Sequence, residues 1–172
     1  MNMVYLLLYV IAAMIVGFVM VKTYQEKDRM RRYVIVLLAL AMICIVSYSV
    51  NFMTDNYNVM SAATSIMMAA QDFLLVSLFI YTTEFARISN KVTKVMTIAA
   101  FVIAIIDSVV FIANIFNEIA VKYSLVKCDG IYVLGYEGEL WFGIHAVMSM
   151  IITACIIAVL VIKCIHIPGA YW

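Results

Sequence analysis

Five apolar stretches, each about 20 residues long, constrain this sequence more than any other feature. They cover residues 3–21, 33–53, 59–82, 95–116 and 141–162. A helix of roughly 20 apolar residues crosses a hydrocarbon core of about 30 Å and satisfies its own backbone hydrogen bonds there. Because 67% of the residues are hydrophobic, a water-soluble domain could not bury its apolar surface. The sequence predicts an all-α membrane protein, a single domain over residues 1–172 that folds as a five-helix transmembrane bundle.

Lysine and arginine are distributed unevenly around these stretches, and this predicts the orientation of the chain. Basic residues resist translocation, so we expect a plasma-membrane protein with the N-terminus outside and the C-terminus in the cytoplasm. A signal peptide is the competing interpretation of the first stretch, but its basic residues follow the apolar run. The basic residues after the first, third and fifth stretches are Lys22, Lys27, Arg29, Arg31, Arg32, Arg87, Lys91, Lys94 and Lys163, whereas the other side has Lys122 and Lys127.

The segment at residues 120–139 differs in character from the apolar stretches. Tyr-Ser-Leu-Val precedes Lys127-Cys128-Asp129-Gly130, and Ile-Tyr-Val-Leu follows it. β-Branched and aromatic runs around an Asp-Gly pair predict a tight two-stranded hairpin. An isolated hairpin is only marginally stable, so we expect this short extracellular β-hairpin to pack as a lid on the outer mouth of the bundle. An irregular linker is the alternative.

Two carboxylates lie within the predicted helices, where a charge costs on the order of several kcal/mol unless it is paired, hydrated or neutralised. Asp72 is near the centre of the third stretch, and Asp107 is near the centre of the fourth. At about 1.5 Å per residue, the two antiparallel helices place them within roughly one turn of the same depth. They could meet and share a proton or a cation. The alternative is a neutral carboxylic acid that hydrogen-bonds a neighbouring backbone or serine group.

Other polar residues gather in the outer half of the predicted bundle. His145, Ser149 and Thr153 recur every four residues along one face of the fifth helix. We therefore expect a pocket that opens outward. Its candidate ligand-binding residues are Asp107, Asn114, His145, Asn51, Tyr48 and Ser65.

The sequence predicts no catalytic residue, no metal site and no cofactor. It lacks the hydrolase, zinc-protease, Walker and kinase motifs, and its cysteines show neither C-x-x-C spacing nor a Cys/His cluster. A bis-histidine haem site needs two facing imidazoles, whereas His145 and His166 lie at opposite ends of the last stretch. We do not expect this chain to be an enzyme.

Several short motifs resemble the N-terminal seven-transmembrane sensor region of bacterial histidine kinases and diguanylate cyclases. The resemblance extends over nearly the whole chain. The motifs are Arg31-Arg32-Tyr33 after the first inner loop, Gln71-Asp72-Phe73 through Tyr81-Thr82-Thr83-Glu84-Phe85 in the third helix, Asn114 near the end of the fourth, and Asp129-Gly130, Gly135-Tyr136 and Trp141-Phe142 before the fifth.

The resemblance implies a sensory input module in signal transduction. An extracellular stimulus at the polar pocket would shift the helix packing, and the shift would reach a cytoplasmic output domain. Members of this family continue with two more helices and a histidine kinase or cyclase domain. This sequence ends shortly after Pro168-Gly169, so we expect the first five helices of a seven-helix sensor.

Two other functions remain open at this point. The chain could be a small transporter or channel subunit that uses Asp72 and Asp107 as a proton or cation relay, or a membrane scaffold without a sensory role. The expected partners are the lipid bilayer, an unidentified small-molecule ligand and, in a possible homodimer, a second copy of the chain. Nucleic acid is not expected as a partner.

Overall fold

The computed structural model describes residues 3–88, 91–128 and 131–165. It confirms a mostly helical chain with a two-stranded hairpin between the fourth and fifth helices. The expected Asp129-Gly130 turn, His166 and the Pro168-Gly169 pair lie outside the described residues. The elements are α1 (Met3–Gln25), α2 (Arg31–Val50), α3 (Tyr57–Ala86), α4 (Lys91–Asn117), β1 (Val121–Cys128), β2 (Ile131–Gly138) and α5 (Leu140–Ile165).

All five helices are long and apolar enough to cross a membrane. Large apolar side chains cover their outer faces, as Phe18, Ile98 and Met150 show with 64%, 65% and 72% of their surface exposed. In water such faces would be costly, whereas lipid is an apolar solvent for them. The chain is therefore a multi-pass membrane protein.

The helix ends differ by a few residues from the predicted apolar stretches. α3 starts at Tyr57 because the side chain of Asn56 accepts hydrogen bonds from the backbone N–H groups of Asn58 and Val59. The prediction that the second helix reaches residue 53 is wrong. α2 ends at Val50, and residues 51–53 form a turn in which each backbone N–H bonds to the carbonyl three residues earlier. Such bonds tighten the end of a helix.

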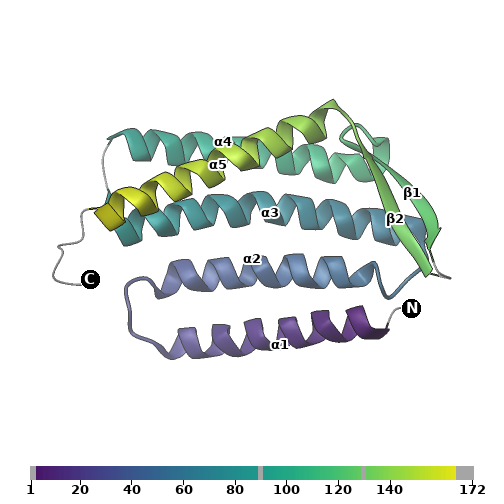
Figure 1. Cartoon of the computed structure of the whole chain (residues 1–172), viewed down its shortest axis with the longest axis horizontal. Helices are drawn as coiled ribbons and strands as arrows, with labels where there is room; N and C mark the ends of the chain where they lie inside the picture. The colour runs from purple at the N-terminus through teal and green to yellow at the C-terminus, as the bar shows by residue number, and fades with distance from the viewer. Residues whose placement is uncertain (1–2, 89–90, 129–130, 166–172) are drawn as a thin grey trace.

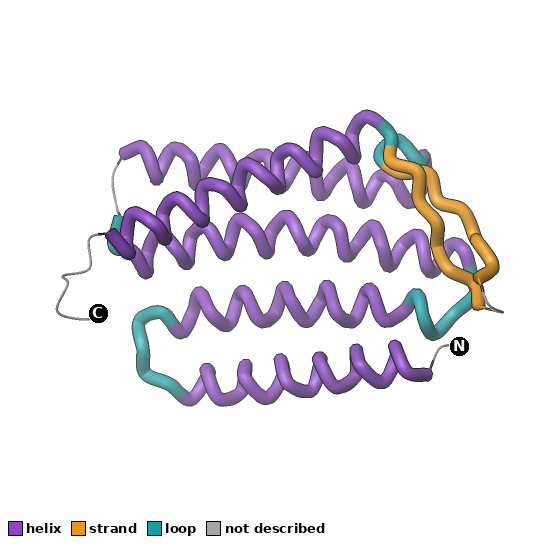
Figure 2. Tube along the Cα trace, viewed as in Figure 1, coloured by secondary structure: helices purple, strands orange, loops and turns teal. Residues whose placement is uncertain are grey.

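Helices that follow one another in the chain run antiparallel, whereas α3, at the centre, and α5 both start at the same end and run parallel (Figure 1). Figure 1 shows α1, α2 and α3 side by side, while α4 and α5 lie on the other side of α3. α3 packs against α2, α4 and α5, and α1 packs against α2. The hairpin crosses one end of the bundle, which we call the hairpin end, and the α1–α2 loop lies at the opposite end (Figure 2).

The hairpin is an antiparallel ribbon that continues directly from α4 and leads directly into α5. β1 and β2 pair along their whole length, from Val121 opposite Gly138 to Cys128 opposite Ile131. An ion pair between Lys122 and Glu139 and a hydrogen bond from Glu139 N to Ala120 O close the ribbon at the helix side. Both strands contact α3, and β2 also contacts α5. The hairpin predicted over residues 120–139 is confirmed.

A left-handed residue redirects the chain between α4 and β1. Glu118 has a φ of 51°, the conformation in which helices commonly end. Its backbone N–H donates to Asn114 O, and its carboxylate accepts a hydrogen bond from the Tyr57 hydroxyl at the start of α3. This turn brings the first strand back over the helix ends.

Candidate functional site

Three ionisable side chains from three helices meet inside the bundle near the hairpin. Asp72 of α3, Asp107 of α4 and His145 of α5 each offer a ligand atom, and these atoms lie within 4.8 Å of one another. His145 Nδ1 is 2.6 Å from Asp107 Oδ2 and 3.2 Å from Asp72 Oδ1. No side chain of the three is more than 8% exposed. We call these residues the Asp72–Asp107–His145 cluster.

Inward-facing stripes on α3 and α4 place the two carboxylates. Both Asp72 and Asp107 stand among buried residues that recur every three or four positions, which is the spacing of one helix face. Several of these residues are small, and small residues let membrane helices approach closely. The buried stripes are Ser65, Ala69, Asp72, Val76 and Phe79 on α3, and Ala100, Ala104, Asp107, Phe111 and Asn114 on α4.

Trp141 fixes the orientation of Asp107. Its indole Nε1–H donates to Asp107 Oδ1 over 2.7 Å, while the other carboxylate oxygen faces His145. Trp141 and His145 are four residues apart on α5, so their side chains lie on the same face, one turn apart. One turn of α5 thus contacts both oxygens of the Asp107 carboxylate.

Aromatic rings surround the imidazole of His145. The ring of Phe111 meets it edge-on at 4.9 Å between centroids, and the ring of Phe142 stacks at 6.2 Å. Phe111 belongs to an apolar core that also contains Ala120, Val121 and Tyr123 from the hairpin side. The hairpin and these rings therefore shield the cluster from solvent.

The cluster has more hydrogen-bond acceptors than donors. The two carboxylates offer four oxygens, and the donors that reach them are Trp141 Nε1 and His145 Nδ1. Asp72 Oδ2 is buried and accepts no hydrogen bond from any described residue. His145 is also the only described basic group within ion-pair distance of the two carboxylates. Buried carboxylates without compensation are costly, so this group has the capacity to hold a cation or an additional proton.

Asn114 attaches the hairpin to α4. Its side chain is fully buried. Asn114 Oδ1 accepts from the backbone N–H groups of Ala120 at 2.7 Å and Val121 at 3.0 Å, and Nδ2 donates to Val121 O at 3.0 Å. These three bonds join its side chain to the backbone at the start of β1, and not to the cluster.

Ser65 and Tyr123 form a second polar contact between the bundle and the hairpin. Ser65 Oγ and the Tyr123 hydroxyl lie 3.3 Å apart, and both side chains are buried. Burial raises the pKa of the Tyr123 phenol, although hydrogen bonds from Ser65 and Asn114 partly offset this effect. Ser65 therefore contacts the hairpin and not the three ionisable residues.

The remaining two predicted site residues lie on the α2 side of the bundle. Asn51 Nδ2 donates to Thr64 Oγ1 over 3.1 Å. Tyr48 is 37% exposed and packs in an aromatic group with Tyr9 and Phe52. The structure thus brings Asp72, Asp107 and His145 together and places the other predicted residues at separate contacts, namely Asn114, Ser65, Asn51 and Tyr48.

Trp141 and Tyr123 also belong to this region, although neither was among the predicted site residues. The spacing of Trp141 and His145 on one helix face could have identified the tryptophan. No comparable signal marked Tyr123. The alternation of side chains along a strand predicts which side of the hairpin a residue faces, but not which helix residue it contacts, here Ser65. Thr153 of the predicted α5 stripe is exposed and hydrogen-bonds back to Ser149 O.

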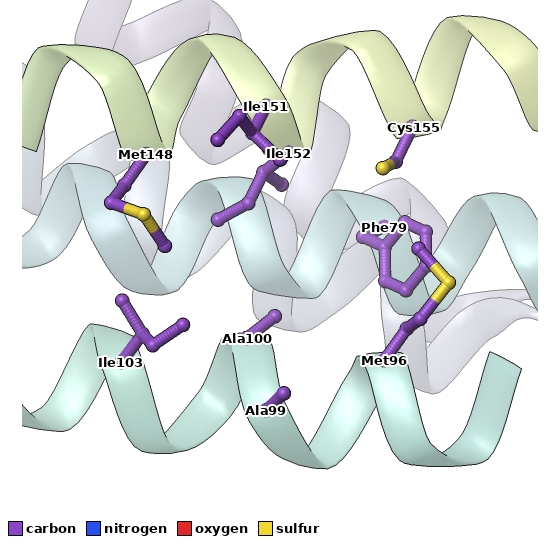
Figure 3. A pocket seen from close by; sticks show the side chains of 9 residues that line it. All are labelled: Phe79, Met96, Ala99, Ala100, Ile103, Met148, Ile151, Ile152 and Cys155. Carbon is purple, nitrogen blue, oxygen red and sulfur yellow. The ribbon is translucent and has the colours of Figure 1, made fainter. Parts of the chain in front are cut away.

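An apolar cavity of about 170 Å³ lies between α3, α4 and α5, beyond the cluster. Figure 3 shows side chains from α4 and α5 facing each other across it, with Phe79 of α3 between them. No charged side chain lines this cavity. Its lining residues are Phe79, Met96, Ala99, Ala100, Ile103, Met148, Ile151, Ile152 and Cys155.

Comparison with known protein families gives one finding. A family model described as the N-terminal 7TM region of histidine kinase matches residues 5–172. Comparisons with curated proteins and with solved structures give no match. The match covers almost all of the chain and includes every residue of the cluster.

Proposed function

Because the chain belongs to the family of N-terminal seven-transmembrane regions of histidine kinases, we propose that it is a membrane-embedded sensory input module whose stimulus acts at the hairpin end. In this family the region is the sensor and is not itself catalytic. The observation that carries the proposal is the Asp72–Asp107–His145 cluster, which joins α3, α4 and α5 directly under the hairpin.

The cluster suits a sensor because its state determines how three helices pack. Ionisable groups within a membrane are costly and mark functional positions by default. Each helix supplies one member, so a ligand, ion or proton that binds one arrangement of the three better than another shifts the packing equilibrium. That difference in binding free energy is the coupling energy that a sensor requires.

α3 and α5 offer a continuous route from the cluster to the opposite end of the bundle. Below the cluster, Phe79 and Ala86 of α3 pack against Ile156 and Val159 of α5. A rotation or shift of α3 against α5 at the cluster therefore displaces their far ends as well, because packed helices move as rigid elements.

An ion pair extends this route to the loop between α1 and α2. Arg29 Nη2 donates to Glu84 Oε2 over 3.3 Å, near the end of α3 that is distant from the hairpin. Basic residues concentrate at this end, so by the positive-inside rule it is cytoplasmic. In this orientation the N-terminus and the hairpin face outward, and the signal travels inward along α3 and α5.

A proton or cation relay is the second candidate function, and the geometry supports it less well. A relay needs carboxylates that exchange ions with water, whereas Asp72 and Asp107 are each 6% exposed. His145 and Trp141 bond to Asp107, and the adjacent apolar core includes residues of the hairpin. The family assignment also favours the sensor.

Distance measurements between spin labels test the proposal. Labels are attached at Phe85 of α3 and Val161 of α5, which are 52% and 50% exposed, after the four native cysteines are replaced. If the cluster controls packing, Asp107→Asn shifts the distance distribution by about 1–2 Å or more, the usual size of helix shifts.

The matched control is Asp55→Asn, which removes an exposed carboxylate from the α2–α3 loop and should leave the distribution unchanged. Identical distributions for Asp107→Asn and the parent chain would contradict the proposed coupling.

A further inference from the structure

We propose that Asp72, Asp107 and His145 form a binding site for a divalent first-row transition-metal ion such as Zn²⁺ or Mn²⁺. This inference deepens the proposed function and rests on it in one respect, namely that the ion, or a ligand held by the ion, is the stimulus. The binding site itself stands on three observations: the donor set, the unpartnered carboxylate oxygen and the surrounding contacts.

The donor set indicates the class of metal. Two carboxylates and one imidazole supply oxygen and nitrogen ligands, which suit zinc, manganese, iron and cobalt. Calcium and magnesium prefer sites made of oxygen alone. Three protein ligands also leave a coordination position open for a further ligand, as in zinc sites that bind an exogenous group.

The two distances from His145 to the carboxylates fit such an ion with a small adjustment, and the third pair of ligand atoms lies within 4.8 Å. At metal–ligand distances of about 2.0–2.2 Å, ligand atoms around a tetrahedral ion lie roughly 3.3–3.6 Å apart. His145 Nδ1 and Asp72 Oδ1 are separated by 3.2 Å. His145 Nδ1 and Asp107 Oδ2 are separated by 2.6 Å, so these two atoms must part by about 0.7–1.0 Å to admit the ion.

Charge and hydrogen bonding both leave room for a cation. Asp72 Oδ2 is buried without a donor, and the side chain of Asp72 is only 7% exposed while its other oxygen faces His145. Two ionised carboxylates carry two negative charges, and the imidazole must be neutral to act as a metal ligand. One divalent ion therefore makes the buried group electrically neutral, and it supplies the missing partner of Asp72 Oδ2 when the carboxylate binds it through both oxygens.

The groups around the three ligands resemble the outer shell of a metal site. Metal-bound carboxylates are usually held by a hydrogen bond to their second oxygen, and Trp141 Nε1 donates such a bond to Asp107 Oδ1 at 2.7 Å. The rings of Phe111 and Phe142 flank the imidazole. An apolar shell of this kind limits water and strengthens the interaction of the ion with its ligands.

Cobalt(II) titration of the whole chain in lipid nanodiscs tests the inference. Co²⁺ replaces Zn²⁺ in sites of this type and gives a visible d–d absorption when nitrogen and oxygen ligands bind it. After treatment with a chelator, the chain should bind one Co²⁺, and Zn²⁺ should displace it while excess Mg²⁺ or Ca²⁺ should not. The affinity tag must contain no histidine.

Three variants and one control separate the site from adventitious binding. His145→Asn keeps a hydrogen-bond donor near the position of Nδ1 but removes the imidazole lone pair, and Asp72→Asn removes one carboxylate. Each should weaken Co²⁺ binding by more than the roughly 10- to 100-fold that loss of an outer-shell contact costs. Trp141→Phe should fall within that 10- to 100-fold range, and Asp55→Asn should bind as the parent chain does.

Two results would overturn the inference. One is the absence of a stoichiometric Co²⁺ or Zn²⁺ site in the parent chain, which would assign the additional positive charge of the cluster to a proton. The other is parent-like binding by both His145→Asn and Asp72→Asn. Neither result affects the spin-label test of the proposed function, because that experiment contains no added metal.

Discussion

Replacing Asn114 by alanine should release the hairpin from the bundle while the transmembrane helices stay folded. The side chain of Asn114 is fully buried and makes three hydrogen bonds to the backbone at the start of β1. Ala120 and Val121, which carry those backbone groups, are 0% and 1% exposed. In the alanine variant two N–H groups and one carbonyl lose their partner in a buried site.

The expected cost follows from these three bonds. A buried hydrogen bond contributes about 1 kcal/mol net, and a buried group left without a partner costs about 1–3 kcal/mol. At about 1 kcal/mol for each bond, the loss of all three bonds costs about 3 kcal/mol. Because each 1.4 kcal/mol is tenfold in an equilibrium constant, the fraction of molecules with an open hairpin should rise roughly 100-fold.

Hydrogen–deuterium exchange measures this opening segment by segment. Amides of β1 and β2 should exchange roughly 100-fold faster in Asn114→Ala, because local opening controls their exchange. Amides in the centre of α3 should be unaffected. The control is Asn117→Ala, three residues further along the same helix. Its exposed side chain accepts one weak bond of 3.4 Å from Ile119 N, so its effect should stay within about 0.5 kcal/mol.

The reasoning fails if Asn114→Ala and Asn117→Ala give the same exchange rates in β1. The apolar core of Phe111, Val121 and Tyr123 would then hold the hairpin without help from the amide. A uniform increase in the exchange rates of all five helices would also contradict the prediction. Such a result would mean that Asn114 stabilises the whole bundle and not the hairpin junction.

Three further predictions concern the hairpin. With Cys128 replaced by serine, a membrane-impermeant maleimide should label Leu125→Cys in intact cells and Cys164 only after permeabilisation, and the reverse pattern would refute the outward orientation of the hairpin. Because burial raises the pKa of the Tyr123 phenol above its ordinary value of 10.0, its protonated form stabilises the fold at lower pH. Thermal stability should therefore decline as pH rises above about 10, and less steeply in Tyr123→Phe; equal declines would contradict this assignment. A methyl group at Gly138 would lie 2.6 Å from the ring of Phe142, whereas a methyl group at Gly143 would have no neighbour within 4 Å. Gly138→Ala should therefore lower stability by about 1–3 kcal/mol, while Gly143→Ala should be neutral or slightly stabilising; equal unfolding midpoints for the two variants would refute the close contact.

Much of the fold follows from local properties of the sequence. The length and hydrophobicity of the five stretches predicted five spanning helices, because lipid leaves the backbone no other way to satisfy its hydrogen bonds. The strand-like segment predicted the hairpin between α4 and α5. The exact end of α2 was not predictable, because its last turn tightens through backbone bonds that apolar composition does not specify.

The candidate site was only partly predictable for a different reason. Helical periodicity gives the inward face of one helix, so it placed Asp72 and Asp107 in the interior and at similar depth. It could not give the rotation and tilt of α5, which decide whether His145 reaches them. Nor could it show that Asn114, seven residues after Asp107, turns to the hairpin backbone, because that contact depends on the left-handed turn at Glu118.

The sequence by itself therefore determined the number of spanning helices, the position of the hairpin and the presence of charged groups within the membrane. These properties depend on the composition and periodicity of one segment at a time. Only the tertiary structure decided that Asp72, Asp107 and His145 converge while Tyr48 and Asn51 stand apart. Convergence depends on how separate helices rotate and tilt against one another, and that is fixed by packing between segments far apart in the chain.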